Sequence, residues 1–429
     1  MIDEKDCTTL RKIAETDVLI CGGGPAGVGA ALSAAREGAS VMIVEMLGCL
    51  GGMATAGMMS HWVGDSSSKL LSEIQERYYL YDHGYTWTDG NTTEKMYIPQ
   101  DLLAIVLEEM MRENGVHILY NTIVCDAVTN GNKACGAVIQ NKSGRGFIKA
   151  KCVIDCTGDG DYAAAAGVPF TKGRDDGKMQ PCTLMFKIGG VDYEKAVFPG
   201  SFETKVNTPK GELQTLAKKL LPYPAGHILL YRQPEPGTVC VNMTNAVGID
   251  GTDTQSVTEG ILTCRSQIMP ILRFLREYVP GYEHCWLMSS AALFGVRETR
   301  RFEGLESLSA EDVLQATYYD NWVVRRAKFN FDVHNITGAG LDKTGVQHKF
   351  SQKNAYTIPY GCLLPVNVEN LLLSGRNISG SHMAHSNYRA MPICMALGEA
   401  AGIAAALAVR QNRNLRELDV KEIQARAGK

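Results

Sequence analysis

The feature that most constrains this chain is a glycine-rich turn after a short apolar run, in the stretch DVLICGGGPAGVGAALSAAREGASVMIVE at residues 17–45. Residues 18–20 have the composition of a buried parallel strand. Gly22, Gly24 and Gly27 then fit the spacing GxGxxG. The first glycine permits a tight turn, the second lets backbone approach a pyrophosphate, and the third lets a helix pack closely on the strand.

The residues after the turn complete this unit. Pro25 stands where a helix begins and where its missing N–H does no harm, and Gly38 is expected to end that helix. Residues 40–44 predict a second strand, which closes on Glu45, roughly 20 residues past the second glycine, the usual position of an acid that binds ribose hydroxyls. The unit predicts a site for adenosine diphosphate and leaves FAD and NAD open; a glycine turn without a ligand is the weaker alternative.

Composition bounds the class of protein. With 429 residues we expect two domains, and a hydrophobic fraction of 45% is enough for large cores. A net charge of -3 without a long basic run gives no electrostatic reason to bind nucleic acid. We expect no membrane span, because no uninterrupted apolar run reaches about 18 residues.

Thirteen cysteines lie singly along the chain, with no CxxC and no zinc-ligand spacing. We therefore expect no metal site and reduced thiols in a cytoplasmic protein. The polar N-terminus lacks the apolar core of a signal peptide, which agrees with that location.

Three later segments decide between the two dinucleotides. They read MLGCLGGMATAG, KCVIDCTGDGDYAAAAGVPF and NLLLSGRNISGSHMAHSNYRAMPICMALGEAAGIAAALA, at residues 46–57, 151–170 and 370–408. With the first unit they closely resemble the FAD-dependent oxidoreductase family of glutathione-reductase-like flavoproteins, nearest in style to its fumarate-reductase and thiazole-biosynthesis branches. The resemblance covers most of the chain. We expect FAD held without a covalent bond, since His61 lies in no recognisable attachment motif, and no dithiol chemistry, since Cys49 stands alone after the second strand.

The resemblance also implies a fold. We expect an α/β protein whose Rossmann-like FAD-binding domain holds a parallel sheet, helices and a small β-meander with turns at 130–131 and 143–144. This domain is expected to be discontinuous, over residues 1–180 and 355–429, with an inserted α+β substrate domain at 181–354. The implied cofactor-binding residues are Gly22, Gly24, Pro25, Ala26, Gly27, Glu45, Met46, Gly51, Gly52, Met53, Ala54, Thr157, Gly158, Gly375, Arg376 and Ala390.

The stretch SHMAHSNYR, residues 381–389, holds the densest group of side chains suited to proton transfer or anion binding. We expect it to be a loop between an FAD strand at 371–374 and a helix at 392–409, whose N-terminus would face the flavin. His382 and His385 would titrate near neutrality, and Arg389 would hold a substrate carboxylate or a flavin carbonyl. The alternative is that each histidine merely bonds backbone.

Two further groups are candidates for the reactive centre. Arg297 and Arg301 share a face if VRETRR is helical and would then bind an anion, although pairing with glutamates such as Glu298 is the slightly stronger alternative. Asp332 and His334 would face one side of a strand as a carboxylate–imidazole pair, with a hydrogen bond at the domain edge as the alternative.

Together these observations predict an enzyme that transfers a hydride between a small organic substrate and FAD while a protein base moves the proton. The catalytic candidates are His382, His385, Arg389, Arg297 and His334. The alternatives are an isomerase or lyase whose FAD does no net redox work, or an FAD-bearing binding subunit. No second GxGxxG unit follows, so an unidentified electron donor or acceptor is needed; a homo-oligomer stays open.

Overall fold

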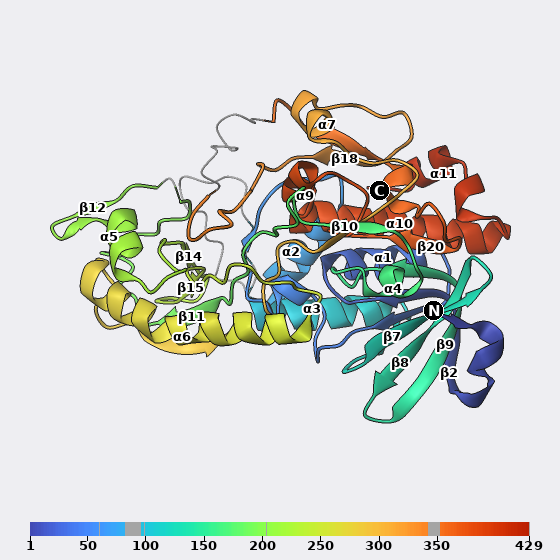
Figure 1. Ribbon diagram of the computed structural model, residues 1–429, viewed down its shortest axis with the longest axis horizontal. Helices are drawn as coiled ribbons and strands as arrows, with labels where there is room; N and C mark the ends of the chain where they lie inside the picture. The colour runs from blue at the N-terminus through green and yellow to red at the C-terminus, as the bar shows by residue number, and fades with distance from the viewer. Residues whose placement is uncertain (60, 82–95, 98, 203, 342–351, 429) are drawn as a thin grey trace.

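The unit expected near the N-terminus is present and belongs to the larger of two lobes (Figure 1). Strand β2 (Arg11–Cys21) leads through the glycine turn into helix α1 (Pro25–Arg36), and strand β3 (Val41–Val44) follows. The computed structural model describes residues 1–59, 61–81, 96–97, 99–202, 204–341 and 352–428.

A mixed eight-stranded sheet forms the centre of this lobe, in the order β1-β7-β8-β9-β2-β3-β6, with β20 also paired to β9. Its other strands are β1 (Ile2–Asp3), β6 (His117–Leu119), β7 (Ile123–Asn130), β8 (Lys133–Asn141), β9 (Gly144–Asp155) and β20 (Leu371–Leu373). Strands β6, β3, β2, β9 and β20 run parallel, and Ile20 lies beside both Ile43 and Ile154. Because such strands are covered on both faces, their paired ends at residues 18–21, 41–44, 152–154 and 371–373 are continuous apolar runs. The expected α/β class with a parallel sheet is confirmed.

The predicted β-meander is also present. Strands β7, β8 and β9 pair antiparallel, and their turns fall at the two predicted positions. Gly131 and Gly144 take φ angles of 59° and 103° there, which glycine adopts without steric conflict.

Helix α10 (Met391–Gln411) lies alongside α1 against the sheet (Figure 1). A Cβ at Gly398 or Gly402 would collide with the carbonyl oxygen of Ala26 or Ala30, so the two helices pack backbone to backbone. By length and composition alone α10 could cross a membrane, yet 94% of its apolar window is buried in the protein. Glu399 interrupts the apolar run of α10, so the sequence shows no continuous apolar run of membrane-spanning length there. The packing of α10 against α1 accounts for the apolar character of this helix.

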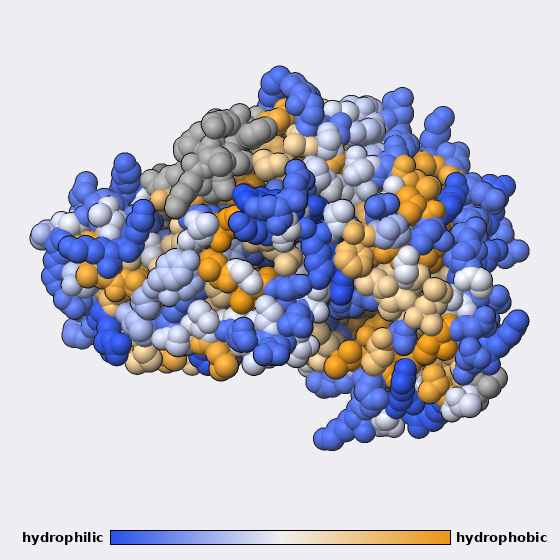
Figure 2. Space-filling model, viewed as in Figure 1, coloured by the Kyte–Doolittle hydropathy of each residue, from blue (hydrophilic) through white to orange (hydrophobic). Residues whose placement is uncertain are grey.

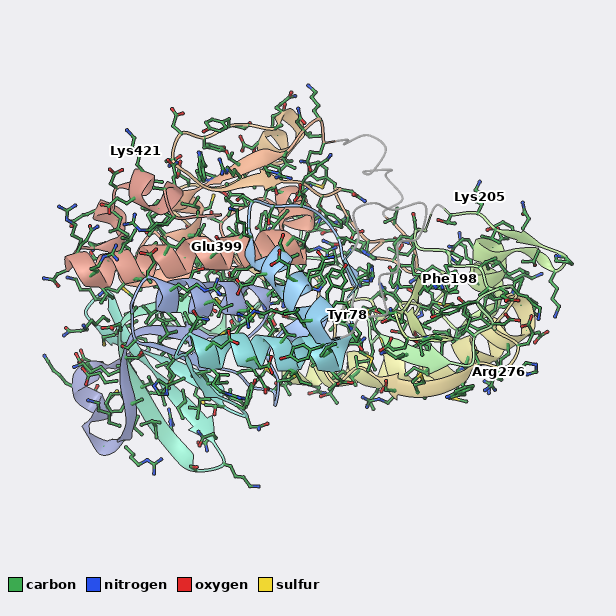
Figure 3. All side chains as sticks on the ribbon, turned by 180° about the vertical axis from the view of Figure 1, so that it is seen from behind. Tyr78, Phe198, Lys205, Arg276, Glu399 and Lys421 are labelled. Carbon is green, nitrogen blue, oxygen red and sulfur yellow. The ribbon has the colours of Figure 1, made fainter. Side chains whose placement is uncertain are left out.

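The smaller lobe has a hydrophobic core of its own. Its sheet has the order β14-β15-β11-β16, and the long helix α6 and helix α5 cover it. The elements are β11 (Phe186–Gly189), α5 (Leu213–Leu220), β14 (Leu230–Arg232), β15 (Val239–Val241), α6 (Thr254–Tyr278) and β16 (Trp286–Ser290). Figure 3 marks this lobe by Phe198 and Arg276, and the larger lobe by Glu399 of α10. The next segment returns to the larger lobe, because Phe302 and Phe331 pack in its core.

The other elements are short and connect or cover these layers. The helices are α2 (Leu70–Tyr81), α3 (Gln100–Glu113), α4 (Asp161–Ala165), α7 (Ala310–Gln315), α9 (His382–Tyr388) and α11 (Val420–Gln424). The 3-10 turns are η1 (Glu4–Thr9), η2 (Gly52–Ala54), η3 (Tyr360–Leu363) and η4 (Leu415–Glu417). The strands are β4 (His61–Trp62), β5 (Met96–Tyr97), β10 (Phe170–Lys172), β12 (Asn207–Thr208), β13 (Gly211–Glu212), β17 (Arg300–Phe302), β18 (Trp322–Ala327) and β19 (Tyr356–Pro359).

One local prediction is wrong, and the conditions attached to two others are not met. Residues 382–388 form helix α9 rather than a loop, because Ser381 caps it by accepting the N–H of Ala384. VRETRR is not helical, since β17 begins at Arg300 and pairs antiparallel with β10. Asp332 lies outside any strand, and His334 makes only an isolated bridge to Leu341. In each case the backbone conformation depends on a capping or pairing interaction that the spacing of apolar and charged residues did not indicate.

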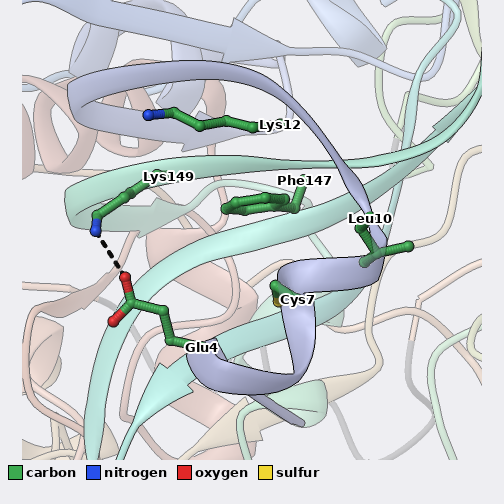
Figure 4. A pocket seen from close by; sticks show the side chains of 6 residues that line it. All are labelled: Glu4, Cys7, Leu10, Lys12, Phe147 and Lys149. Atoms are coloured by element: carbon green, nitrogen blue, oxygen red, sulfur yellow. Dashed lines mark ion pairs between the residues drawn. The ribbon is translucent and has the colours of Figure 1, made fainter.

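The surface has apolar patches and a small cavity that lie away from the carboxyl ends of the strands. Figure 2 shows hydrophilic residues over much of one face, with apolar patches between them. A cavity of about 340 Å³ lies between the N-terminal segment and β9, where Glu4 and Lys149 form an ion pair of 2.7 Å (Figure 4). It is lined by Glu4, Cys7, Leu10, Lys12, Phe147 and Lys149, none of which the sequence predicts to bind cofactor or substrate.

Candidate active site

The glycine turn leaves an open cradle before the N-terminus of α1. Gly22 has a φ of 99°, which favours glycine. A Cβ at Gly27 would collide with the carbonyl of Gly22, whereas a Cβ at Gly24 would meet no described atom within 4 Å. Gly24 is the N-cap and makes no side-chain cap, so Pro25 and Ala26 open a helix whose first free N–H groups face this space. The cradle therefore fits a pyrophosphate.

The segment 46–54 packs against this turn. The N–H of Gly51 donates to the carbonyl of Gly23 at 2.8 Å, and a Cβ at Gly52 would lie 3.1 Å from the Cα of Gly24. Ala54 is buried at the end of η2. Two glycines with positive φ thus bring a second stretch of backbone beside the cradle.

Two methionines of this segment differ in their surroundings. Met46 is 59% exposed, so it lies at the outer end of the segment. Met53 points the other way, and its Cε lies 3.3 Å from the Cβ position of Gly295. Met53 therefore links the glycine turn to residues near the smaller lobe.

Glu45 is buried directly behind the turn. Its Oε2 accepts the N–H of Gly23 at 2.6 Å, and its Oε1 accepts the N–H of Leu47 at 2.8 Å. Burial raises the pKa of this carboxyl above its usual value. Each oxygen keeps a further lone pair, so Glu45 holds the turn and still has capacity to bind ribose hydroxyls.

The end of β9 forms the next wall. Asp155 accepts from the N–H and the Oγ1 of Thr157, at 3.0 and 2.7 Å, and from the N–H of Ala163 at 2.7 Å. Burial raises the pKa of Asp155 to about 6. These bonds fix the turn in which Gly158 takes a φ of 81°.

The end of β20 completes the arrangement. A Cβ at Gly375 would lie 3.2 Å from the Cβ of Ala26, in the first turn of α1. Arg376 donates from Nη2 to Oδ1 of Asp159 at 2.6 Å, and this nitrogen lies 3.1 Å from the Cβ position of Gly158. The predicted cofactor residues thus meet at the carboxyl ends of parallel strands, where open α/β sheets bind ligands.

The two histidines of α9 lie in different surroundings. His382 contacts Oε1 of the buried Glu298 through Nδ1 at 2.6 Å. Arg301 donates to the same oxygen at 2.8 Å, which confirms the alternative of glutamate pairing for this arginine. His385 is fully buried against Tyr388, and burial lowers its pKa well below its usual value. The expectation that His385 titrates near neutrality is therefore wrong.

A polar cluster lies where α9, the smaller lobe and residues 332–334 meet. We use this name for Gln180, His227, Arg297, Asp332, His334 and Arg389. Arg389 donates from Nη2 to Oδ2 of Asp332 at 2.7 Å and to its carbonyl at 2.8 Å. Nε2 of His334 lies 3.3 Å from the same Oδ2. The predicted carboxylate–imidazole pair is thus formed, although no strand holds it.

Charge and burial tune this pair. His334 and Arg389 oppose the effect of burial and hold the pKa of Asp332 far below its usual value. Burial, with the charge of Arg297, lowers the pKa of His334 to about 4. His334 is therefore neutral at pH 7, and its Nε2–H donates to Asp332, which leaves Nδ1 able to accept a proton.

Two members of the cluster come from opposite sides of the smaller lobe. Arg297 donates from Nη1 to the carbonyl of Pro181 at 2.5 Å, and burial lowers its pKa to about 10. His227 bonds the carbonyl of Asn242 through Nε2 at 3.0 Å, and burial lowers its pKa to about 3. Sequence reasoning missed His227 and Gln180, since neither lies in a motif.

Other predicted residues lie at the edge of this arrangement. Ala390 is the N-cap of α10, and its Cβ lies 3.3 Å from the Cβ position of Gly64. His61 packs against Tyr231 with ring centroids 3.8 Å apart and ring planes tilted by 44°, and this pair was also not predicted to be near the site. Among the described residues no group of His, Cys, Asp and Glu could hold a metal ion.

The family model described as FAD dependent oxidoreductase matches residues 17–426. The chain is 28% identical over 165 residues to the thiamine thiazole synthase of Aeropyrum pernix and 32% identical over 161 residues to that of Pyrococcus horikoshii. Each match covers 35% of this chain, and the chain spans 57% and 60% of the length of these two relatives.

Among solved structures, a geranylgeranyl bacteriochlorophyll reductase-like protein of Thermoplasma acidophilum superposes with a TM-score of 0.48 at 14% identity, over 96% of this chain and 82% of that one. The match to the family model shows that FAD is the cofactor, and the open cradle at Gly24 fits its diphosphate. The match across nearly the whole chain shows that this protein belongs to the FAD-dependent oxidoreductase family of enzymes.

Proposed function

We propose that this enzyme transfers a hydride between a small organic substrate and non-covalently bound FAD, with the polar cluster as the substrate-side site. The observation that carries the proposal is the Asp332–His334 pair, a neutral imidazole held by a carboxylate. Bound FAD supplies the hydride chemistry, and the protein supplies binding, orientation and proton transfer.

In this proposal His334 is the base. Asp332 accepts from Nε2–H and so orients the ring, and Nδ1 takes the proton of a substrate O–H or N–H. Arg389 donates to the same oxygen of Asp332, with an Nη2–Oδ2 distance of 2.7 Å. The low pKa of His334 keeps the ring neutral, hence able to accept a proton, at every pH well above about 4.

The cofactor assignments extend this proposal. Glu45 would bind ribose hydroxyls, the cradle at Gly24 the diphosphate, and the turns at Gly158 and Gly375 would border the remainder of FAD. The mutual packing of these segments on α1 supports them. His382 and His385 are weaker candidates for proton transfer, because Glu298 engages one ring and the core encloses the other.

The division of labour between the lobes is part of the proposal. The FAD-binding part would comprise residues 1–180 and 355–429, and the substrate-facing part would lie in 181–354. The separate core of the smaller lobe supports it. The packing of Phe302 and Phe331 in the other core favours an earlier end to the substrate-facing part.

Partner and location are proposed on weaker grounds. All thirteen cysteines are free, which favours a reducing compartment such as the cytoplasm. A separate electron donor or acceptor would complete the redox cycle. We keep an isomerase or lyase as the second candidate, because a neutral base beside a carboxylate serves proton shuttling without net oxidation equally well.

An anaerobic bleaching experiment tests the proposal. FAD-loaded protein is mixed with a panel of alcohols, amines, amino acids and hydroxy acids, and flavin absorbance is followed. Bleaching by one compound, with appearance of its two-electron oxidised product, supports hydride transfer. Conversion of a compound into an isomer while the flavin stays oxidised contradicts it and favours the second candidate.

A further inference from the structure

The polar cluster carries a positive charge that its own members do not balance. Arg297 and Arg389 are cations, whereas Asp332 is the single carboxylate among the six residues. His227 and His334 are neutral at pH 7, since burial lowers their pKa values to about 3 and about 4. The cluster as described therefore has a net charge of one positive unit.

The cluster also holds N–H donors without an acceptor. Nε of Arg389 and Nε2 of Gln180 are buried, and neither has a hydrogen-bond partner among the described residues. Gln180 is 1% exposed, and its Oε1 accepts the N–H of His334 at 3.1 Å, which fixes the orientation of its amide. A buried donor left unbonded is strongly unfavourable, so such groups mark positions that a ligand completes.

These donors belong to one connected arrangement. Gln180 bonds His334, His334 contacts Asp332, and Asp332 accepts from Arg389. Arg297 reaches the carbonyl of the residue directly after Gln180. Among the described acceptors it bonds only this one carbonyl, so most of its guanidinium donors stay available.

From this excess of charge and donors we infer that the substrate is an organic carboxylate, whose oxygens bind between Arg297, Arg389 and the amide of Gln180. This deepens the proposed function and rests on it, because it takes the polar cluster as the place where the substrate binds. A single carboxylate balances the one positive unit, and its two oxygens match the planar fork of a guanidinium.

Calorimetric titration of the FAD-loaded protein tests the inference without any turnover. The probes are acetate, benzoate and succinate, each titrated beside its neutral amide, with inorganic phosphate as a further anion. We expect at least one carboxylate to bind while its amide does not. Equal binding of acid and amide, binding of phosphate alone, or no binding of any carboxylate would overturn the inference.

Variants locate the site. Arg297→Gln should weaken the carboxylate at least about tenfold, as expected for loss of a charge-assisted hydrogen bond. Arg297→Lys, which keeps the charge but loses the fork, should bind with intermediate affinity and covers the case in which the glutamine variant does not fold. Arg273→Gln, at an exposed arginine of α6, is the matched control and should bind like the wild type. Unchanged affinity in both Arg297 variants would contradict the inference.

The outcomes for the inference and for the proposed function are separable. If a carboxylate binds through Arg297 but no compound bleaches the flavin, the redox proposal fails and the anion site stands. If a neutral compound bleaches the flavin while carboxylates neither bind nor compete with it, the redox proposal stands and the anion site is refuted.

Discussion

The glycine cradle and the polar cluster are built in opposite ways. The cradle consists mostly of backbone, and Gly22, Gly24 and Gly27 lie within a single short turn of the chain. The polar cluster consists of side chains, and its six members come from five separate segments between Gln180 and Arg389. One site therefore depends on close approach of main chains, and the other on charges that the fold brings together.

The two regions therefore tolerate different kinds of substitution. At Gly27 of the cradle, and at Gly398 where α10 packs on α1, an added methyl group strikes backbone, so the expected damage is to packing and cofactor affinity. In the cluster a change of functional group leaves the volume nearly intact, so the expected damage is to chemistry. Four predictions follow the contrast, from the largest effect to the smallest.

His334→Gln should have the largest effect on the reaction. Glutamine retains a polar side chain but is no base, and loss of general base catalysis lowers rates by about 10²–10⁴-fold. FAD content and the free energy of unfolding should change little at neutral pH. The measurement is the anaerobic rate of flavin reduction by whichever substrate bleaches it.

Two comparisons make the His334 result interpretable. His382→Gln, at the ring bonded to Glu298, should retain a rate much closer to wild type. If His382→Gln slows the reaction more than His334→Gln does, the base belongs to α9, and the polar cluster is not the site of proton transfer.

Gly398→Ala should produce the largest loss of stability. The new Cβ would meet the carbonyl oxygen of Ala26, so α10 and α1 must separate along their line of contact. Overpacking against backbone lowers the free energy of unfolding by about 3 kcal/mol. Urea unfolding followed by circular dichroism measures this. A variant as stable as wild type would show that the helices do not pack backbone to backbone.

Gly24→Ala should separate cofactor binding from folding. Its Cβ would enter open space in the FAD-free protein, so the free energy of unfolding without FAD should be unchanged. The same Cβ would displace the diphosphate, and loss of one charge-assisted hydrogen bond, about 1.5–3 kcal/mol, weakens FAD about tenfold to a hundredfold. Fluorescence titration of FAD-free protein with FAD gives the affinity.

Glu45→Ala is the matched comparison for Gly24→Ala. This change leaves the N–H groups of Gly23 and Leu47 without their acceptors, so both FAD affinity and stability should fall. Normal FAD affinity in both variants would place the diphosphate elsewhere.

The pH dependence of stability should have opposite signs in the two regions, so the two contributions partly cancel and leave the smallest net change per pH unit. His227 and His334 have folded pKa values near 3 and 4, below an unfolded value of 6.5, so their contributions are lost as pH falls below 6.5. Asp155 has a folded pKa of about 6, above its unfolded 3.8, so its contribution is lost as pH rises between those values. Each group contributes at most about 1.4 kcal/mol per pH unit.

Urea unfolding between pH 4.5 and pH 7 checks this sign. His227→Gln keeps a donor for the carbonyl of Asn242 but does not titrate, so its stability should fall less steeply on the acid side than that of the wild type. An unchanged slope would mean that His227 is not buried in its neutral form.

Prediction from sequence succeeded where structure is local. The turn from Gly22 to Gly27 and the β-meander turns at 130–131 and 143–144 depend on residues a few positions apart, and both are formed as the patterns predict. Local pattern left open whether VRETRR is helical, because the partner that makes it a strand lies more than a hundred residues earlier. His227 and Gln180 gave no signal, since an isolated histidine or glutamine looks the same in a core as in a site.

The amino-acid sequence alone sufficed to predict the cofactor, the strand–turn–helix that receives it and the parallel sheet behind it. It could do so because glycine spacing and apolar periodicity act through backbone geometry over short distances. Only the tertiary structure decided that His385 is sealed in the core, that Arg301 belongs to Glu298, and that Arg297 and Arg389 meet around Asp332 and His334. Burial and long-range electrostatics set the charge and pKa of each such group, and both depend on neighbours that only the folded chain brings together.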